Sequence, residues 1–105
     1  MNNSSPVVSL EGSVLSVAGE VNANTVIELR KQGEKLISGA QGPLTVDLAK
    51  LATAHSVVLS MLMCWQRLGQ TKQVVLSFEG ASDRLQSLAA LSNLEAHLPG
   101  FSAHS

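Results

Sequence analysis

Aromatic residues are scarce in this chain. Its 105 residues include one tryptophan, two phenylalanines and no tyrosine. Because apolar residues still make up 45% of the chain, leucine, valine and alanine must fill most of the interior. A chain of this length is typical of one domain built around one core.

An excess of charge of either sign is also missing. Seven basic and eight acidic residues leave a formal net charge of −1. Proteins that bind nucleic acid or anionic membranes usually carry a basic patch or a positive net charge. We therefore expect neither nucleic acid nor direct membrane insertion, although the protein can still dock on a membrane complex.

The sequence offers little for disulfides, metals or membrane spans. Cys64 is the only cysteine, so no intrachain disulfide can form, and no Cys/His cluster has the spacing of a zinc site. Residues 1–6 lack the basic and apolar segments of a signal peptide. No apolar run reaches the roughly 18–20 residues that span a bilayer. We expect a cytoplasmic protein without a metal or another cofactor.

The apolar pattern predicts seven elements in the order β-β-α-β-α-β-α. Expected strands cover residues 7–11, 14–18, 44–48 and 74–78, and expected helices cover 25–38, 56–69 and a segment that begins at Ser82. Thr25 and Glu28 have the spacing of a capping box, and Ser56 is the expected N-cap of the second helix.

Strands that alternate with helices predict a small α/β domain, in which helices pack against a mixed sheet. We place this single domain at residues 7–98. Residues 1–6 form a disordered tail in this interpretation, and residues 99–105 form a C-terminal tail.

One polar dipeptide, His55-Ser56, separates an alternating apolar strand from the second helix. Adjacent residues seldom place an imidazole on the neighbouring hydroxyl, and the chain has no G-x-S-x-G elbow and no phosphate-binding glycine motif. Asp47 is expected to accept backbone N–H groups near a strand end. We therefore predict that the protein is not an enzyme and that this turn is a docking point.

The second helix carries more apolar residues than one buried stripe needs. The stripe itself consists of Val58, Met61, Leu62, Trp65 and Leu68. Leu59 and Met63 fall outside it. Such residues either widen the contact with the core or form an exposed patch for a partner, and the sequence leaves both interpretations open.

Three motifs, in this order, resemble those of STAS domains, the modules of sulphate transporters and anti-sigma-factor antagonists. Val17–Asn22 resembles the family's GEL/GEV-D signature after the second strand. Val46-Asp47-Leu48, followed by His55–Leu59, resembles its V-D-L strand and its D-[ST]-[SG]-G-L loop. Val74–Phe78, Gly80 and Leu85–Leu94 match its last strand and helix, so the resemblance covers nearly the whole chain.

Within that family, the small size and the ending Leu88–Leu94 are most similar to the STAS subunits of bacterial phospholipid-transport ABC complexes, which maintain outer-membrane lipid asymmetry. The resemblance implies a non-enzymatic subunit that binds and supports the ABC transporter ATPase. Ser56 then takes the position of the loop hydroxyl at the ATPase contact. The expected partner-binding residues are His55, Ser56, Val57, Leu59, Ser60 and Met63.

The alternative implied by the resemblance is an anti-sigma-factor antagonist that binds a regulatory kinase and is switched by serine phosphorylation. Two departures from the family pattern bear on it. His55 replaces an acidic residue, and Val57-Val58 replace a small or hydroxyl residue and a glycine. Signalling members carry the phosphorylated hydroxyl at the position of Val57. The departures favour a constitutive binding role and leave Ser56 as the candidate phosphosite.

Overall fold

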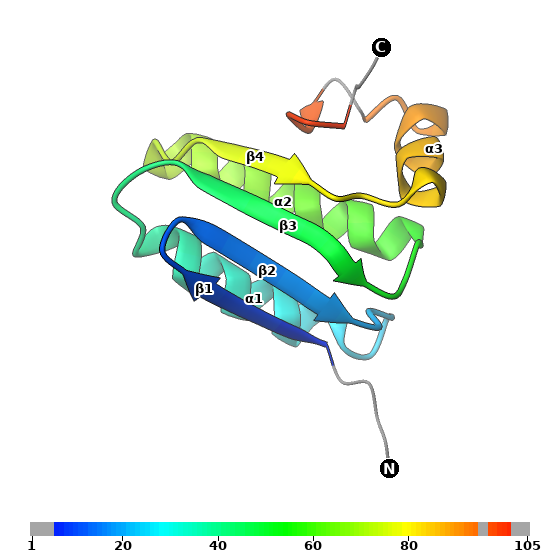
Figure 1. The fold of residues 1–105 in the computed structure, drawn as a ribbon, viewed down its shortest axis with the longest axis horizontal. Helices are drawn as coiled ribbons and strands as arrows, with labels where there is room; N and C mark the ends of the chain where they lie inside the picture. Colours follow the sequence, from blue (N-terminus) through cyan, green and yellow to red (C-terminus); the bar gives the residue numbers. More distant parts are fainter. Residues whose placement is uncertain (1–5, 95–96, 102–105) are drawn as a thin grey trace.

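Four strands form one sheet in the order β1-β2-β3-β4 (Figure 1). The structure is a computed structural model that describes residues 6–94 and 97–101. The strands are β1 (Val7–Glu11), β2 (Val14–Gly19), β3 (Leu44–Leu51) and β4 (Leu76–Glu79), and the helices are α1 (Val26–Ser38), α2 (Ser56–Lys72) and α3 (Asp83–Leu91). The predicted element order and the mixed α/β architecture are confirmed.

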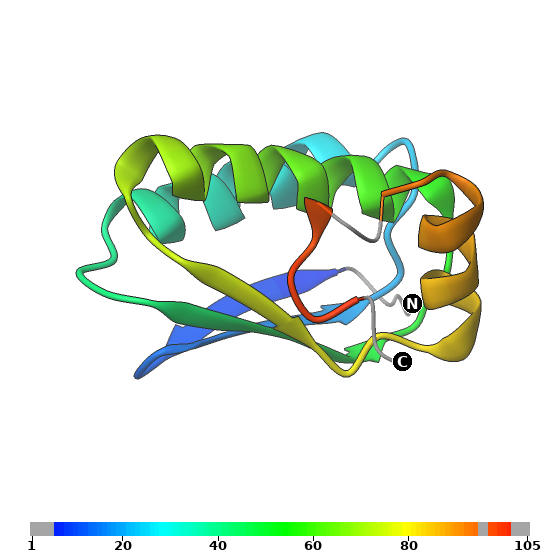
Figure 2. The ribbon, with the colours of Figure 1, turned by 90° about the horizontal axis from the view of Figure 1, so that it is seen from above.

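The strand pairing explains why two helices share one face of the sheet. β1 and β2 form an antiparallel hairpin around Gly12, whose φ is +60°, whereas β2–β3 and β3–β4 are parallel pairs. Each parallel pair needs a crossover, which α1 and α2 supply. Because such crossovers are right-handed and the strands advance in one direction, both helices cover the same face (Figure 2).

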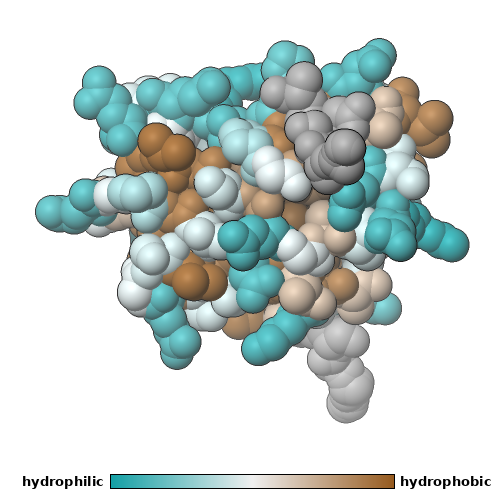
Figure 3. All heavy atoms as spheres, turned by 45° about the horizontal axis from the view of Figure 1, so that its top comes forward, coloured by the Kyte–Doolittle hydropathy of each residue, from teal (hydrophilic) through white to brown (hydrophobic). Residues whose placement is uncertain are grey.

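The other face of the sheet is left without helices. Side chains alternate along β3, so Leu44, Val46 and Leu48 are buried beneath the helices, whereas Asp47 points to the outer face. Figure 3 shows this face obliquely, together with the edge of the molecule at β4, and apolar residues there occur in separate patches among polar ones.

The contact between α1 and α2 depends on one glycine. Gly33 is buried in α1, and a Cβ atom built there would overlap the indole ring of Trp65, which is fully buried in α2. The indole N–H of Trp65 donates a hydrogen bond of 3.0 Å to the carbonyl oxygen of Arg30. The helices therefore pack at a distance that only a glycine permits at this position.

The domain extends further than the predicted boundary at residue 98. Phe101 is 2% exposed and makes an edge-to-face contact with Phe78, their ring centroids 6.0 Å apart. The backbone N–H of Phe78 donates to the carbonyl oxygen of Pro99 at 2.8 Å, so residues 98–101 cover the free edge of β4. Placing residues 99–101 in a tail was wrong. The remaining predicted tail residues, 1–5 and 102–105, lie outside the described residues.

The start of α1 differs from the prediction, whereas the start of α3 agrees with it. Thr25 is the N-cap of α1, but its side chain makes no capping hydrogen bond; its hydroxyl instead accepts from the N–H of Asn22 at 3.0 Å. The predicted capping box with Glu28 was therefore wrong. At α3 the prediction is confirmed, because the Ser82 hydroxyl accepts from the N–H of Leu85 at 3.1 Å.

We predict that Gly33→Ala destabilises the domain by about 1–3 kcal/mol, because the added methyl group forces the buried Trp65 ring to shift. Urea unfolding measures the effect. Gly42→Ala is the matched control, since a Cβ atom there meets nothing within 4 Å. Equal stability of the two variants would contradict the proposed helix contact.

We also predict that Phe101→Ala lowers the free energy of unfolding by about 3–5 kcal/mol, as expected for the loss of a buried aromatic ring. Leu91→Ala is the control, because Leu91 is 82% exposed and its truncation changes stability by less than about 0.5 kcal/mol. Thermal or urea unfolding of both variants checks the boundary. If Phe101→Ala leaves the free energy of unfolding unchanged, residues 99–101 do not contribute to the folded core.

Candidate functional site

The polar dipeptide His55-Ser56 lies at the amino-terminal end of α2, as the sequence predicts. The capping residue differs from the prediction. His55 is the N-cap, with extended φ and ψ of −143° and 151°, and Ser56 is the first helical residue. The carbonyl oxygen of His55 accepts the N–H of Val58 at 2.9 Å, and no side chain caps the helix. The prediction that Ser56 is the N-cap was wrong. Both side chains are exposed.

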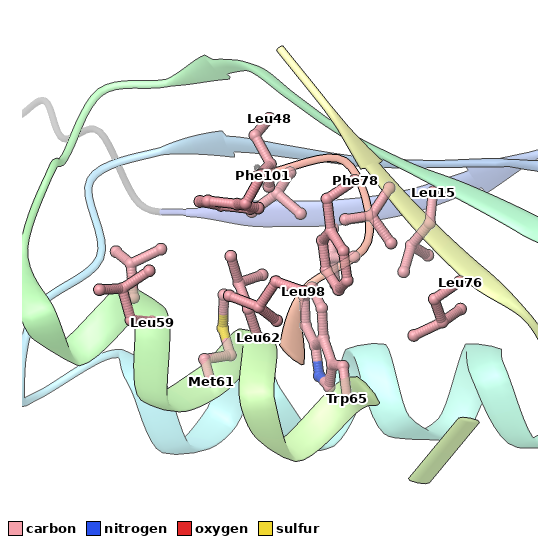
Figure 4. Packing of buried hydrophobic residues seen from close by; sticks show 14 of the residues in the cluster. Leu15, Leu48, Leu59, Met61, Leu62, Trp65, Leu76, Phe78, Leu98 and Phe101 are labelled. Atoms are coloured by element: carbon pink, nitrogen blue, oxygen red, sulfur yellow. The ribbon is translucent and has the colours of Figure 1, made fainter. Parts of the chain in front are cut away.

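Leu59 does not belong to the exposed surface of α2. It is 2% exposed and lies, with Leu62, in the interior between α2 and the sheet (Figure 4). The apolar stripe is thus wider than the helical spacing suggested, because Leu59 is part of the same buried core as Val58 and Leu62. Leu59 cannot contact a partner directly, and its assignment as a partner-binding residue is corrected.

The other predicted residues of α2 lie on two sides of its exposed face. Val57 is half-buried and Ser60 is exposed, and both line a groove between α1 and α2. Met63 is half-buried and lines a separate hollow, together with Gln66, Arg67, Gln70, His97 and Pro99. The predicted partner-binding residues therefore lie on two different sides of α2 and do not form one continuous site.

The groove between α1 and α2 has a volume of about 270 Å³ and is mostly apolar. We call it the α1/α2 groove; its lining residues are Val26, Ile27, Arg30, Val57, Ser60, Met61 and Cys64. Ile27 stands out because 57% of this large apolar side chain is exposed. Cys64 is half-buried there, as expected for a cysteine within an apolar helix.

Sequence analysis missed the contribution of α1 to this groove. Ile27 and Arg30 both lie outside the buried stripe of α1, which consists of Leu29, Gly33 and Ile37. An isoleucine off the core stripe of a helix is a detectable signal. That Ile27 lines a groove becomes apparent only in the tertiary structure, where α1 packs beside α2.

Asp47 and His55 lie on different sides of the sheet. Asp47 accepts the N–H of Ala49 at 3.0 Å on the outer face of the sheet, which confirms its predicted backbone role, whereas His55 precedes a helix on the inner face. Across residues 6–94 and 97–101, no three His, Cys, Asp or Glu side chains gather as a metal site would need. Nor is any described helix both long and apolar enough to cross a membrane.

Solved structures of anti-sigma factor antagonists have a similar fold. One, from Mycobacterium paratuberculosis, is 22% identical, has a TM-score of 0.71 and is matched over 90% of this chain and 81% of its own. Another, SpoIIAA in its unphosphorylated form, is 13% identical, has a TM-score of 0.70 and is matched over 89% of this chain and 84% of its own. No curated protein sequence matches this chain.

A family model described as "Mlab, STAS domain" matches residues 5–100. The match covers all the strands and helices of the domain. STAS domains generally bind partner proteins. The chain therefore belongs to the STAS domain family.

Proposed function

We propose that this protein is the MlaB-like subunit of a bacterial phospholipid-transport ABC complex, where it binds and supports an MlaF-like ATPase at the cytoplasmic side of the inner membrane. The observation that carries the proposal is the match of residues 5–100 to the family model described as Mlab. In this role the protein has no enzymatic activity of its own and contributes to outer-membrane lipid asymmetry.

The proposed docking surface is the exposed face at the amino-terminal half of α2. It contains His55 and Ser56 at the turn, Val57 and Ser60 in the α1/α2 groove, and Met63 on the opposite flank of the helix. Exposed apolar area next to hydroxyl groups is typical of a binding surface. The 57% exposed side chain of Ile27 extends this surface onto α1.

The second candidate is an anti-sigma-factor antagonist controlled by a kinase. Two observations favour it: two solved structures with a similar fold are anti-sigma factor antagonists, and Ser56 is exposed at the first residue of α2. A phosphate there would be stabilised by the free N–H groups of the helix start. Against it stands Val57, which has no hydroxyl at the position that signalling members phosphorylate.

Ser60→Trp tests the docking surface without changing charge. The indole would occupy the α1/α2 groove, so we expect the affinity for the ATPase to fall by at least about tenfold, which corresponds to about 1.4 kcal/mol. The measurement is co-purification with the ATPase of the ABC complex, followed by biolayer interferometry with purified proteins.

Ser77→Trp is the matched control, because Ser77 is exposed in β4 on the face of the sheet without helices. Its affinity should equal that of the wild type. Circular dichroism confirms that both variants are folded. If Ser60→Trp binds as tightly as Ser77→Trp, the docking surface lies elsewhere on the domain.

Phosphorylation separates the two candidate functions. We expect no phosphate on the chain after incubation with ATP and an anti-sigma kinase from the same organism, as measured by intact-protein mass spectrometry. A single phosphate that disappears in Ser56→Ala would instead support the kinase-controlled antagonist.

A further inference from the structure

The charges on the helical face of the domain are unevenly distributed. Over its 17 residues α2 has no Asp or Glu, and its charged residues are Arg67 and Lys72. The chain as a whole carries a formal net charge of −1, so its acidic residues are concentrated on other elements. α1 adds three basic residues, Arg30, Lys31 and Lys35, and two acidic residues, Glu28 and Glu34, so the two helices together carry five basic and two acidic residues. An excess of basic residues on this face of a weakly acidic domain favours a partner surface with negative charge.

Arg30 is the one charged residue that lines the α1/α2 groove. Its Nε atom is buried without a hydrogen-bond acceptor among the described residues, and the nearest carboxylate oxygen, Oε2 of Glu34, is 3.7 Å away. That distance exceeds a hydrogen bond, and an ion pair about one-third exposed stabilises a protein only weakly. The Nε–H group of Arg30 is therefore left without an acceptor among the described residues.

The backbone around Arg30 is held in place independently of its side chain. Its carbonyl oxygen accepts the indole N–H of Trp65 at 3.0 Å, and Trp65 is fully buried against Gly33. Because a fixed main chain restricts where the guanidinium can reach, Arg30 is presented at the groove with less loss of conformational entropy on binding.

We propose that the α1/α2 groove accepts an aliphatic side chain of the partner and that a neighbouring Asp or Glu of the partner pairs with the guanidinium of Arg30. The apolar part of the groove, Val26, Ile27, Val57 and Met61, contacts the aliphatic group. The planar guanidinium binds a carboxylate through two N–H donors, a geometry that lysine cannot reproduce. This inference rests on the proposed function and names the chemistry of the partner at the same site.

Charge reversal at Arg30 tests the inference with the purified MlaF-like ATPase as the probe. Arg30→Glu should weaken binding by about 100-fold, whereas Arg30→Gln and Arg30→Lys should weaken it by roughly tenfold, because each loses the paired donors without repulsion. Raising the NaCl concentration should weaken binding of the wild type more than that of Arg30→Gln.

Lys35→Glu is the matched control. Lys35 is exposed on the flank of α1 that faces β1, where it lines a different hollow with Val8 and Leu36, so the same change in charge occurs outside the groove. Binding by this variant should stay within about threefold of the wild type, since rim charges contribute little. Arg30→Met, which keeps the alkyl chain, checks by thermal unfolding that the loss of charge leaves the fold intact.

Two negative results have different meanings. If the wild type binds and Arg30→Glu binds as tightly as Lys35→Glu, the proposed carboxylate contact is wrong and the proposed function survives. If the wild type itself does not bind the ATPase, the proposed function is overturned and the inference falls with it. A change of one Asp or Glu of the ATPase to Lys that restores binding to Arg30→Glu would identify the pairing residue.

Discussion

The contact between Gly33 and Trp65 is the constraint on which the helical layer depends. The largest buried side chain of the domain lies against a position that has no side chain, and its indole N–H is bonded to the backbone one turn earlier, at Arg30. The ring of Trp65 is thus packed against α1, and its indole N–H is hydrogen-bonded to the same helix. Together they set how α1 and α2 lie over the sheet.

The candidate binding surface is a consequence of that contact. Arg30 lies three residues before Gly33, and Cys64 is adjacent to Trp65, so the α1/α2 groove begins where the close helix contact ends. Ile27 and Val57 leave apolar area at this place that the core does not cover. A groove on a rigid pair of helices suits binding, because little conformational entropy is lost when the partner docks.

Much of the fold could be predicted from periodicity alone. The hairpin, the three helices and the mixed sheet all follow from apolar spacing and turn residues such as Gly12 and Ser82. Errors occurred where a distant segment changes the local environment. Leu59 lies off the predicted helical stripe but is buried in the common core, and Phe101 belongs to the core because β4 is an edge strand that residues 98–101 cover.

The amino-acid sequence by itself determined the element order, the aliphatic core, the polar turn at His55-Ser56 and the resemblance to STAS domains, because these depend on residues close together in the chain. Only the tertiary structure decided which side of α2 is free and which residues of α1 join it. Burial of Leu59 and exposure of Ile27 are set by packing between elements that do not follow each other directly in the chain, such as α1 and α2, which are separated by β3. No local pattern records such contacts.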